Sequence, residues 1–119
     1  MAIYSNLPVY KDAYSLLLTV SRQSPNIPKD SRYTLVQDLK RCLMDILVMI
    51  YEANSTFDKE VVISKMRRKI VEAQVYLRLL VDMRQVSEGW YATAAAQSAS
   101  VSKQLAAWQK SSHDRQSQQ

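Results

Sequence analysis

Glycine and proline are scarce in this sequence, which has one glycine and three prolines among its 119 residues. Folds built only from β-strands need many tight turns, and these two residue types form most of them. The scarcity therefore argues against an all-β fold and predicts long helices. No internal repeat is present, and a chain of this length suits a single domain with one core.

Residues that carry enzyme chemistry are also scarce. The single cysteine, Cys42, permits no intrachain disulfide and lies in an apolar run, where a buried, unreactive thiol is expected. The only histidine, His113, lies near the end of the chain, and no pair of cysteines or histidines has metal-ligand spacing. One glycine is too few for a glycine-rich phosphate loop. The sequence therefore predicts a protein that is not an enzyme, with no catalytic residue, metal, cofactor or small-molecule substrate.

Long apolar runs are missing as well. The longest extends from Cys42 to Tyr51, is interrupted by Asp45, and is about half as long as a bilayer span requires. Residues 1–8 show no basic segment followed by an apolar run, so no signal peptide is expected. These absences predict a cytoplasmic protein that does not enter a membrane.

Positive charge is in excess, with 16 lysines and arginines against 11 acids, a net charge of +5 and a pI near 9.4. Such a balance favours RNA, DNA or an acidic protein surface as a partner, but many basic proteins bind none of these.

Four stretches have the apolar spacing and end signals of helices: about 8–24, 30–53, 58–86 and 90–110. Short connections favour antiparallel neighbours. The expected fold is all-α, an up-down-up-down four-helix bundle over residues 1–112, followed by a flexible C-terminal tail over 113–119 that lacks periodicity.

The third stretch carries two apolar strips. The main strip advances in steps of three and four, as a core-facing helix does: Ile63, Met66, Ile70, Ala73, Leu77 and Leu80. The second strip lies opposite, toward the C-terminal half: Tyr76, Leu79, Met83 and Val86. Because one bundle buries only one side of a peripheral helix, the second strip suggests an oligomer interface. Cover by a loop or by the tail is the alternative.

The same stretch carries the densest positive charge of the chain. The candidate binding residues on it, with two more on the second helix, are Lys65, Arg67, Arg68, Lys69, Arg78, Lys40 and Arg41. One interpretation is contact with the backbone of a polyanion, with weak sequence preference. The other is a solvated polar face without a partner.

Asp45 is the only acid in the apolar run of the second helix. A buried carboxylate requires a cationic partner, so we expect a lysine or arginine from another helix or subunit. Leaving one such charge buried without its partner costs about 3–5 kcal/mol.

Several short segments of the first three stretches resemble a known family. They are Leu7-Pro8-Val9-Tyr10-Lys11, Pro28-Lys29, Arg32-Tyr33-Thr34-Leu35 and Tyr51-Glu52-Ala53-Asn54. They are similar to the Avd family, the accessory variability determinants of bacterial and phage diversity-generating retroelements. That family is related to the four-helix-bundle proteins encoded in ribosomal RNA intervening sequences. The last helix and the tail match only in size and character.

The resemblance implies a four-helix bundle that assembles as a homopentameric barrel with a basic surface. It implies a reverse transcriptase and its template RNA, or an RNA/DNA hybrid, as partners. The implied function is non-catalytic support of the mutagenic cDNA synthesis that diversifies a target gene. The family carries its function on a surface, so the resemblance assigns no individual residue. The alternative is a structural bundle of the intervening-sequence type with an unidentified protein partner.

Overall fold

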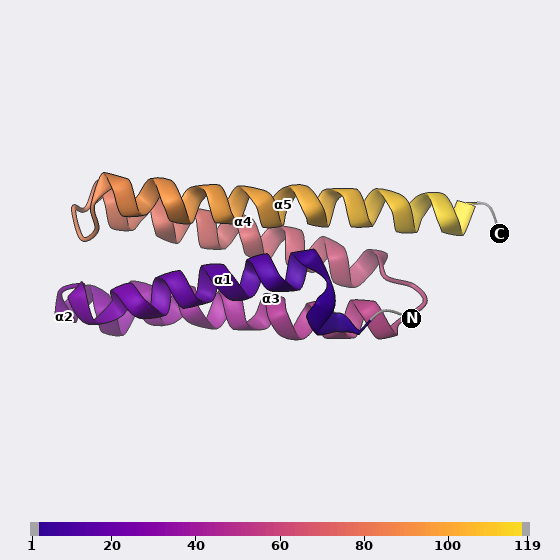
Figure 1. Cartoon of the computed structure of the whole chain (residues 1–119), viewed down its shortest axis with the longest axis horizontal. Helices are drawn as coiled ribbons and strands as arrows, with labels where there is room; N and C mark the ends of the chain where they lie inside the picture. Colours follow the sequence, from indigo (N-terminus) through magenta and orange to yellow (C-terminus); the bar gives the residue numbers. More distant parts are fainter. Residues whose placement is uncertain (1–2, 118–119) are drawn as a thin grey trace.

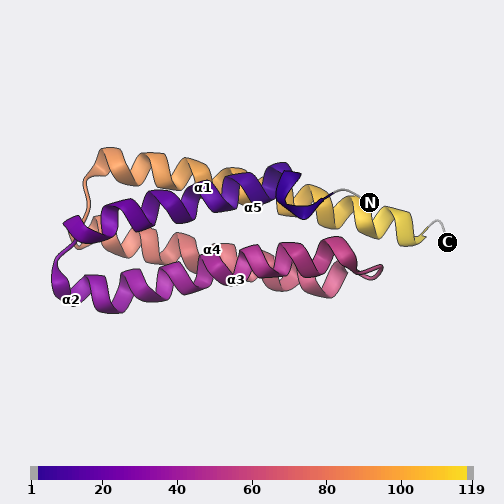
Figure 2. The same ribbon diagram turned by 60° about the horizontal axis from the view of Figure 1, so that its bottom comes forward.

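Four long helices make up most of the structure: α1 (Pro8–Gln23), α3 (Gln37–Ser55), α4 (Glu60–Asp82) and α5 (Glu88–Ser117). The computed structural model describes residues 3–117, and no strand occurs among them. The helices lie side by side along one axis, each antiparallel to the next (Figures 1 and 2), in a body of 52 × 21 × 20 Å. α1 and α4 each pack against both α3 and α5. The prediction of an all-α chain with four long helices is confirmed, and their arrangement is that of an up-down-up-down bundle.

The first helix has the predicted bounds. Pro8 occupies the first turn of α1, where its missing N–H needs no partner. The helix gives way to a 3₁₀ turn, Ser24–Asn26, because Pro25 cannot continue it. A second 3₁₀ turn, Tyr4–Asn6, precedes α1 and packs against both α1 and α3.

The second predicted helix begins with the short α2 (Lys29–Ser31) and continues through a π-helical turn, Arg32–Val36, into α3. The Arg32 guanidinium donates hydrogen bonds to the carbonyl oxygens of Pro25 at 2.9 Å and Ile27 at 3.0 Å, which hold the preceding connection against the helix. A π-helical turn inserts an extra residue and changes the phase of the side chains. As a result Val36 is buried, whereas its neighbour Leu35 is half-buried.

α4 ends at Asp82, four residues before the predicted end. Arg84 has a left-handed backbone (φ 59°), and the Gln85 N–H returns to the Leu80 carbonyl oxygen at 2.8 Å. This is a common way for a helix to end, because it satisfies carbonyls that lack partners. The turn directs Val86 into the core, where it is 8% exposed. The assignment of Val86 to a surface strip is therefore wrong.

α5 is longer than predicted. The sequence placed its end near Lys110, but the helix continues to Ser117. Ser112 is buried, and the His113 Nδ1 atom lies 3.9 Å from a Glu60 carboxylate oxygen, so this segment still contacts α4. Residues 118–119 lie outside the described part of the chain. The flexibility of residues 113–119 remains a prediction.

The core runs along the middle of the bundle. All six residues of the main strip of α4 are buried, as predicted: Ile63, Met66, Ile70, Ala73, Leu77 and Leu80. Each of the other three long helices also contributes buried apolar residues, at helical spacing. Within residues 3–117, no helix combines the length and the apolar character that crossing a bilayer would take.

Candidate nucleic-acid interface

Two of the five cations predicted on α4 have acidic partners. Lys69 faces α3, where its Nζ atom lies 3.1 Å from the Asp45 carboxylate and 3.9 Å from that of Glu72. The hydrogen bond to Asp45 raises the pKa of Lys69. The Arg78 Nε atom donates to both Asp82 carboxylate oxygens, at 3.0 and 3.1 Å, which raises the pKa of Arg78. These two charges are locally balanced, so Lys69 and Arg78 attract a polyanion less than unpaired cations do, and their predicted role stays a prediction.

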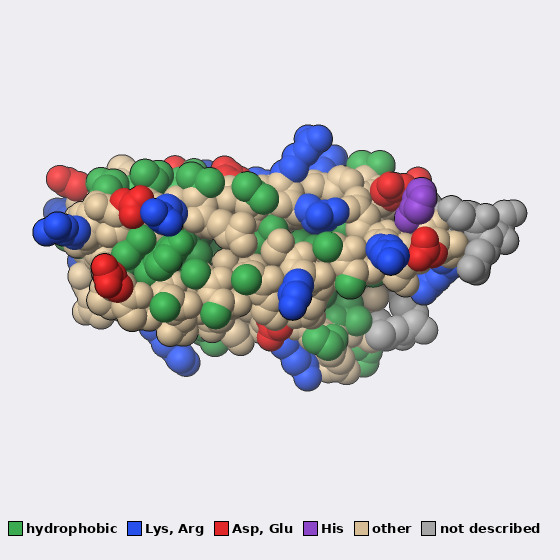
Figure 3. Space-filling view, turned by 90° about the horizontal axis from the view of Figure 1, so that it is seen from above, with side chains coloured by type: hydrophobic (Ala, Val, Ile, Leu, Met, Phe, Trp, Pro, Cys, Tyr) green, Lys and Arg blue, Asp and Glu red, His purple; other side chains and the backbone are tan. Residues whose placement is uncertain are grey.

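The other three cations, Lys65, Arg67 and Arg68, are exposed and form no ion pair within residues 3–117. Lys65 and Arg68 are three residues apart and therefore lie on the same side of the helix. Arg67 and Arg68 line one groove together. We call these three residues the basic surface. Figure 3 shows lysine and arginine side chains over the middle of the α4–α5 face, with acidic side chains mainly toward its two ends.

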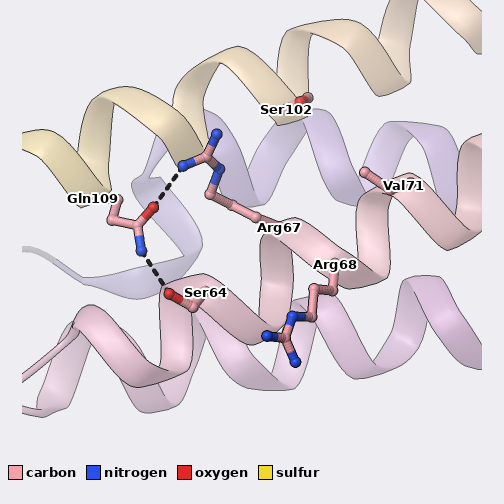
Figure 4. Close-up of a pocket in the computed structure, with 6 residues that line it drawn as sticks. All are labelled: Ser64, Arg67, Arg68, Val71, Ser102 and Gln109. Carbon is pink, nitrogen blue, oxygen red and sulfur yellow. Dashed lines mark hydrogen bonds between the residues drawn. The ribbon is translucent and has the colours of Figure 1, made fainter.

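The groove between α4 and α5 has a volume of about 460 Å³. It is lined by Ser64, Arg67, Arg68, Val71, Ser102 and Gln109. Figure 4 shows Arg67 directed across it toward α5, whereas Arg68 points away from α5. The Arg67 Nη1 atom donates to the Gln109 Oε1 atom at 2.6 Å, and the Gln109 Nε2 atom donates to the Ser64 hydroxyl at 2.7 Å.

This arrangement suits phosphate. The bond to Gln109 uses one of the five N–H donors of Arg67, so the others remain available for a ligand. A guanidinium binds phosphate oxygens in a bidentate manner, and its charge persists at any physiological pH. Arg67 and Arg68 line one groove, so a phosphate group that enters it would meet guanidinium donors.

The sequence did not reveal the groove residues contributed by α5. Gln109 and Ser102 lie 42 and 35 residues beyond Arg67 and belong to no motif. Ser64 adjoins the predicted cluster but is an ordinary surface residue by type. Only the packing of α4 against α5 brings them together, and no pattern in a single sequence indicates it.

Lys40 and Arg41 lie on α3, and their part in the basic surface stays a prediction. Lys40 precedes Met44 by one turn, and Met44 lines a groove between α3 and α1. Arg41 precedes Asp45 by one turn and therefore lies on the side of α3 that faces α4, near the Asp45–Lys69 pair. The two residues occupy different sides of α3.

Asp45 has the lysine partner that the sequence predicted, but the pair is not buried. The side chains of Lys69 and Asp45 keep 33% and 43% of their exposure. Beside this pair, the buried Cys42 thiol donates to the Lys69 carbonyl oxygen at 3.1 Å. Burial, together with the nearby Glu72 carboxylate, raises the pKa of Cys42 to about 12, so its thiol stays neutral and unreactive at pH 7.

We expect Asp45→Leu to lower the free energy of unfolding by less than about 1 kcal/mol, because solvent-exposed ion pairs contribute about 0–1 kcal/mol. This replaces the larger cost expected for a buried pair. Chemical denaturation measures the change. The matched control is Glu52→Leu, an exposed acid of the same helix without an ion pair in the described residues. A loss of 3 kcal/mol or more for Asp45→Leu alone would contradict the exposed-pair interpretation.

α4 has a second, exposed apolar strip, but its residues differ in part from those predicted. Leu79 and Met83 are 40% and 50% exposed, whereas Tyr76 is half-buried against the core and Val86 is buried. Burial raises the pKa of the Tyr76 hydroxyl. Exposed valines at steps of four extend the strip toward the basic surface. The outer strip, as we define it, consists of Val71, Val75, Leu79 and Met83. Its role as an oligomer interface remains a prediction.

Compared with models of known protein families and with curated proteins, the chain matches none. The likeness to the Avd family therefore depends on the residues quoted above. Within residues 3–117, no three histidine, cysteine, aspartate or glutamate side chains form a group that could hold a metal ion. The predicted absence of a cofactor and of catalysis remains a prediction.

Proposed function

We propose that this chain is a cytoplasmic, non-enzymatic accessory protein of a diversity-generating retroelement. In this proposal it binds the reverse transcriptase and the template RNA, or an RNA/DNA hybrid, through its basic surface. Its role is to support mutagenic cDNA synthesis by holding the two partners together. The proposal includes assembly into a homo-oligomer, specifically a pentamer.

One observation carries the proposal: Lys65, Arg67 and Arg68 are exposed without acidic partners, while the neighbouring Lys69 and Arg78 are paired. Three unbalanced cations on one helix attract a polyanion, and a phosphate backbone satisfies them without base recognition. The two other elements of the proposal, the polymerase and the retroelement, come from the resemblance to the Avd family alone.

Assembly would enlarge the basic surface. Three cations on one subunit make a small patch, but a closed ring repeats the patch once per subunit. The outer strip begins one turn after Arg67 and Arg68 on the same helix. An interface formed through it would therefore bring basic surfaces of neighbouring subunits toward one another.

The test is the affinity of the purified protein for single-stranded RNA across a salt series, with its mass recorded in the same buffer. A protein that contacts roughly 6 phosphates of a single strand loses about 2.5 decades of affinity between 50 and 200 mM salt. Steep weakening together with an oligomeric mass is the expected result. A monomer that binds no RNA at low salt would overturn the proposal. It would favour the structural bundle of the intervening-sequence type, whose basic face is only solvated.

We expect Met83→Glu to lower the mass of the assembly in light scattering, because it places a charge in an apolar interface. Met83 is 50% exposed in the single chain, so the substitution should leave the fold unchanged. The control is Phe57→Glu, the same kind of change at a residue that is 69% exposed and lies outside the outer strip. An unchanged mass for Met83→Glu would show that assembly does not use this strip.

A further inference from the structure

A second groove lies between α1 and α3, away from the basic surface. It has a volume of about 480 Å³, within the range of small-molecule binding sites. It is lined by Tyr4, Tyr10, Tyr14, Leu17, Met44, Leu47, Val48 and Tyr51. Four of these eight residues are tyrosines, and the chain has only seven. We call this site the tyrosine groove.

The tyrosine rings support one another. The Tyr4 ring packs edge-on against those of Tyr10 and Tyr51, with centroids 5.4 and 5.1 Å apart. Tyr10 and Tyr14 are nearly parallel, with centroids 6.3 Å apart and an interplanar angle of 17°. Tyr14 and Tyr51 nevertheless remain 47% and 54% exposed. The groove therefore presents pre-positioned aromatic rings, part of whose surface is in contact with solvent.

Lysines outnumber acids around the groove. None of the residues that line it is acidic. Lys11 follows Tyr10 and lies one turn before Tyr14, and Lys40 lies one turn before Met44. The nearest acid on α1, Asp12, is turned toward α5, where it accepts hydrogen bonds from Ser100 and Gln104. On α3, Asp45 is bound to Lys69 on the side of α4. Glu52, which follows Tyr51 and lies one turn after Val48, is the one exposed acid beside these lining residues.

We propose that the tyrosine groove binds the unpaired bases of a single-stranded nucleic acid, which stack on Tyr14 and Tyr51 while Lys11 and Lys40 contact its phosphates. Aromatic rings beside cations are the usual construction of single-strand sites, because every base has a flat face and sequence matters little. A duplex cannot use the site, because its bases are already stacked and paired. The proposal goes beyond the basic surface, which contacts phosphates of either form.

The test uses a fluorescent 12-nucleotide RNA of mixed sequence, alone and annealed to its complement. Each stacked base is worth about 1–3 kcal/mol, so Tyr14→Ala and Tyr51→Ala should each weaken single-strand binding about 5- to 150-fold. Tyr14→Phe keeps the ring and should retain the affinity. Binding of the duplex should change less than twofold in all three variants. The matched control is Tyr33→Ala, a tyrosine that is 57% exposed and lies outside the groove.

Three results would overturn this inference. One is an unchanged single-strand affinity in Tyr14→Ala and Tyr51→Ala. Another is an equal loss for strand and duplex. The third is a fall in the mass of the assembly in these variants, which would make the groove an interface between copies of the chain. A failure of the proposal for the basic surface can be distinguished from a failure of this one. Replacing Lys65, Arg67 and Arg68 should weaken the binding of both single-stranded and duplex RNA, whereas replacing the tyrosines should weaken the binding of the single strand alone.

Discussion

Replacing Lys65, Arg67 and Arg68 together by glutamine is expected to weaken RNA binding on the order of 100-fold. A hydrogen bond to a charged group contributes about 1.5–3 kcal/mol, and the loss of two such bonds already corresponds to that factor. The slope of log affinity against log salt should also become shallower by about 2, because each contact to a single strand contributes about 0.7. The fold should be retained, because all three side chains are exposed and none takes part in an ion pair within residues 3–117. Fluorescence anisotropy across a salt series measures both quantities.

The control for this variant removes the same number of positive charges from another part of the surface. Arg22, Lys29 and Arg84 are exposed cations at the opposite end of the bundle from the start of α4 (Figure 1). Their triple replacement by glutamine should weaken binding only slightly, through the lower net charge. If both triple variants lose the same affinity, the protein attracts RNA by net charge alone and the basic surface has no special role. If neither variant loses affinity, the cations are only solvated.

Lys69 is deliberately left unchanged in this experiment. The sequence analysis placed Lys69 with Lys65, Arg67 and Arg68 because a sequence alone does not show which of several neighbouring cations has an acidic partner. In the structure its partners are Asp45 and Glu72. Removing Lys69 would leave Asp45 without its hydrogen-bond partner and mix a change in stability with a change in binding. Whether a cation on a helix is free to bind a ligand depends on the direction in which its side chain points and on whether the neighbouring helix places an acid there.

The helices themselves could be predicted closely from the sequence, since each has a continuous apolar strip and a recognisable end. The errors occurred where backbone geometry rather than side-chain pattern decides. The left-handed conformation of Arg84 ends α4 early, and no glycine marks that position. The π-helical turn Arg32–Val36 shifts the seam by one residue, which the spacing of apolar residues does not show.

The candidate sites were less accessible to prediction than the helices. Both grooves form between helices, from residues that are far apart in sequence. Tyr4, Tyr14 and Tyr51 are scattered over three elements, and no spacing rule groups them. The sequence did show that residues 42–51 form its longest apolar run. α3 is one of four equivalent members of the bundle, and Met44, Val48 and Tyr51 are about half exposed. The excess apolar character therefore belongs to a surface.

Two apolar surfaces on a bundle of this size are unusual, because one bundle needs only one buried strip per helix. The outer strip lies on α4, whereas the tyrosine groove lies between α1 and α3. The strip is aliphatic, whereas the groove is aromatic and bordered by lysines. Aliphatic side chains at steps of four suit contact with another helix, and aromatic rings beside cations suit bases. The two surfaces are therefore expected to respond to different experiments.

Leu77→Ala is expected to lower the free energy of unfolding by about 2–5 kcal/mol, because it removes buried methyl groups and leaves a cavity. Leu77 lies on the main strip of α4 and is 1% exposed. A chain of this length has a total stability on the order of 6–18 kcal/mol, so the loss is a large fraction of it. Chemical denaturation with an unchanged slope against denaturant concentration would attribute the loss to the native core.

Leu79→Ala provides the matched comparison, since it is the same substitution two residues further along the same helix. Leu79 is 40% exposed, so its loss should cost less than about 1 kcal/mol in the single chain, as surface substitutions generally do. If the assembly uses the outer strip, however, the mass of the Leu79→Ala assembly should fall at low protein concentration. The mass of the Leu77→Ala assembly should stay unchanged under all conditions in which that variant is folded. Equal destabilisation by the two substitutions would mean that Leu79 belongs to the core. A stable Leu79→Ala variant whose assembly has an unaltered mass would show that the outer strip is not an oligomer interface. The exposed apolar residues of the strip would then have no assigned partner.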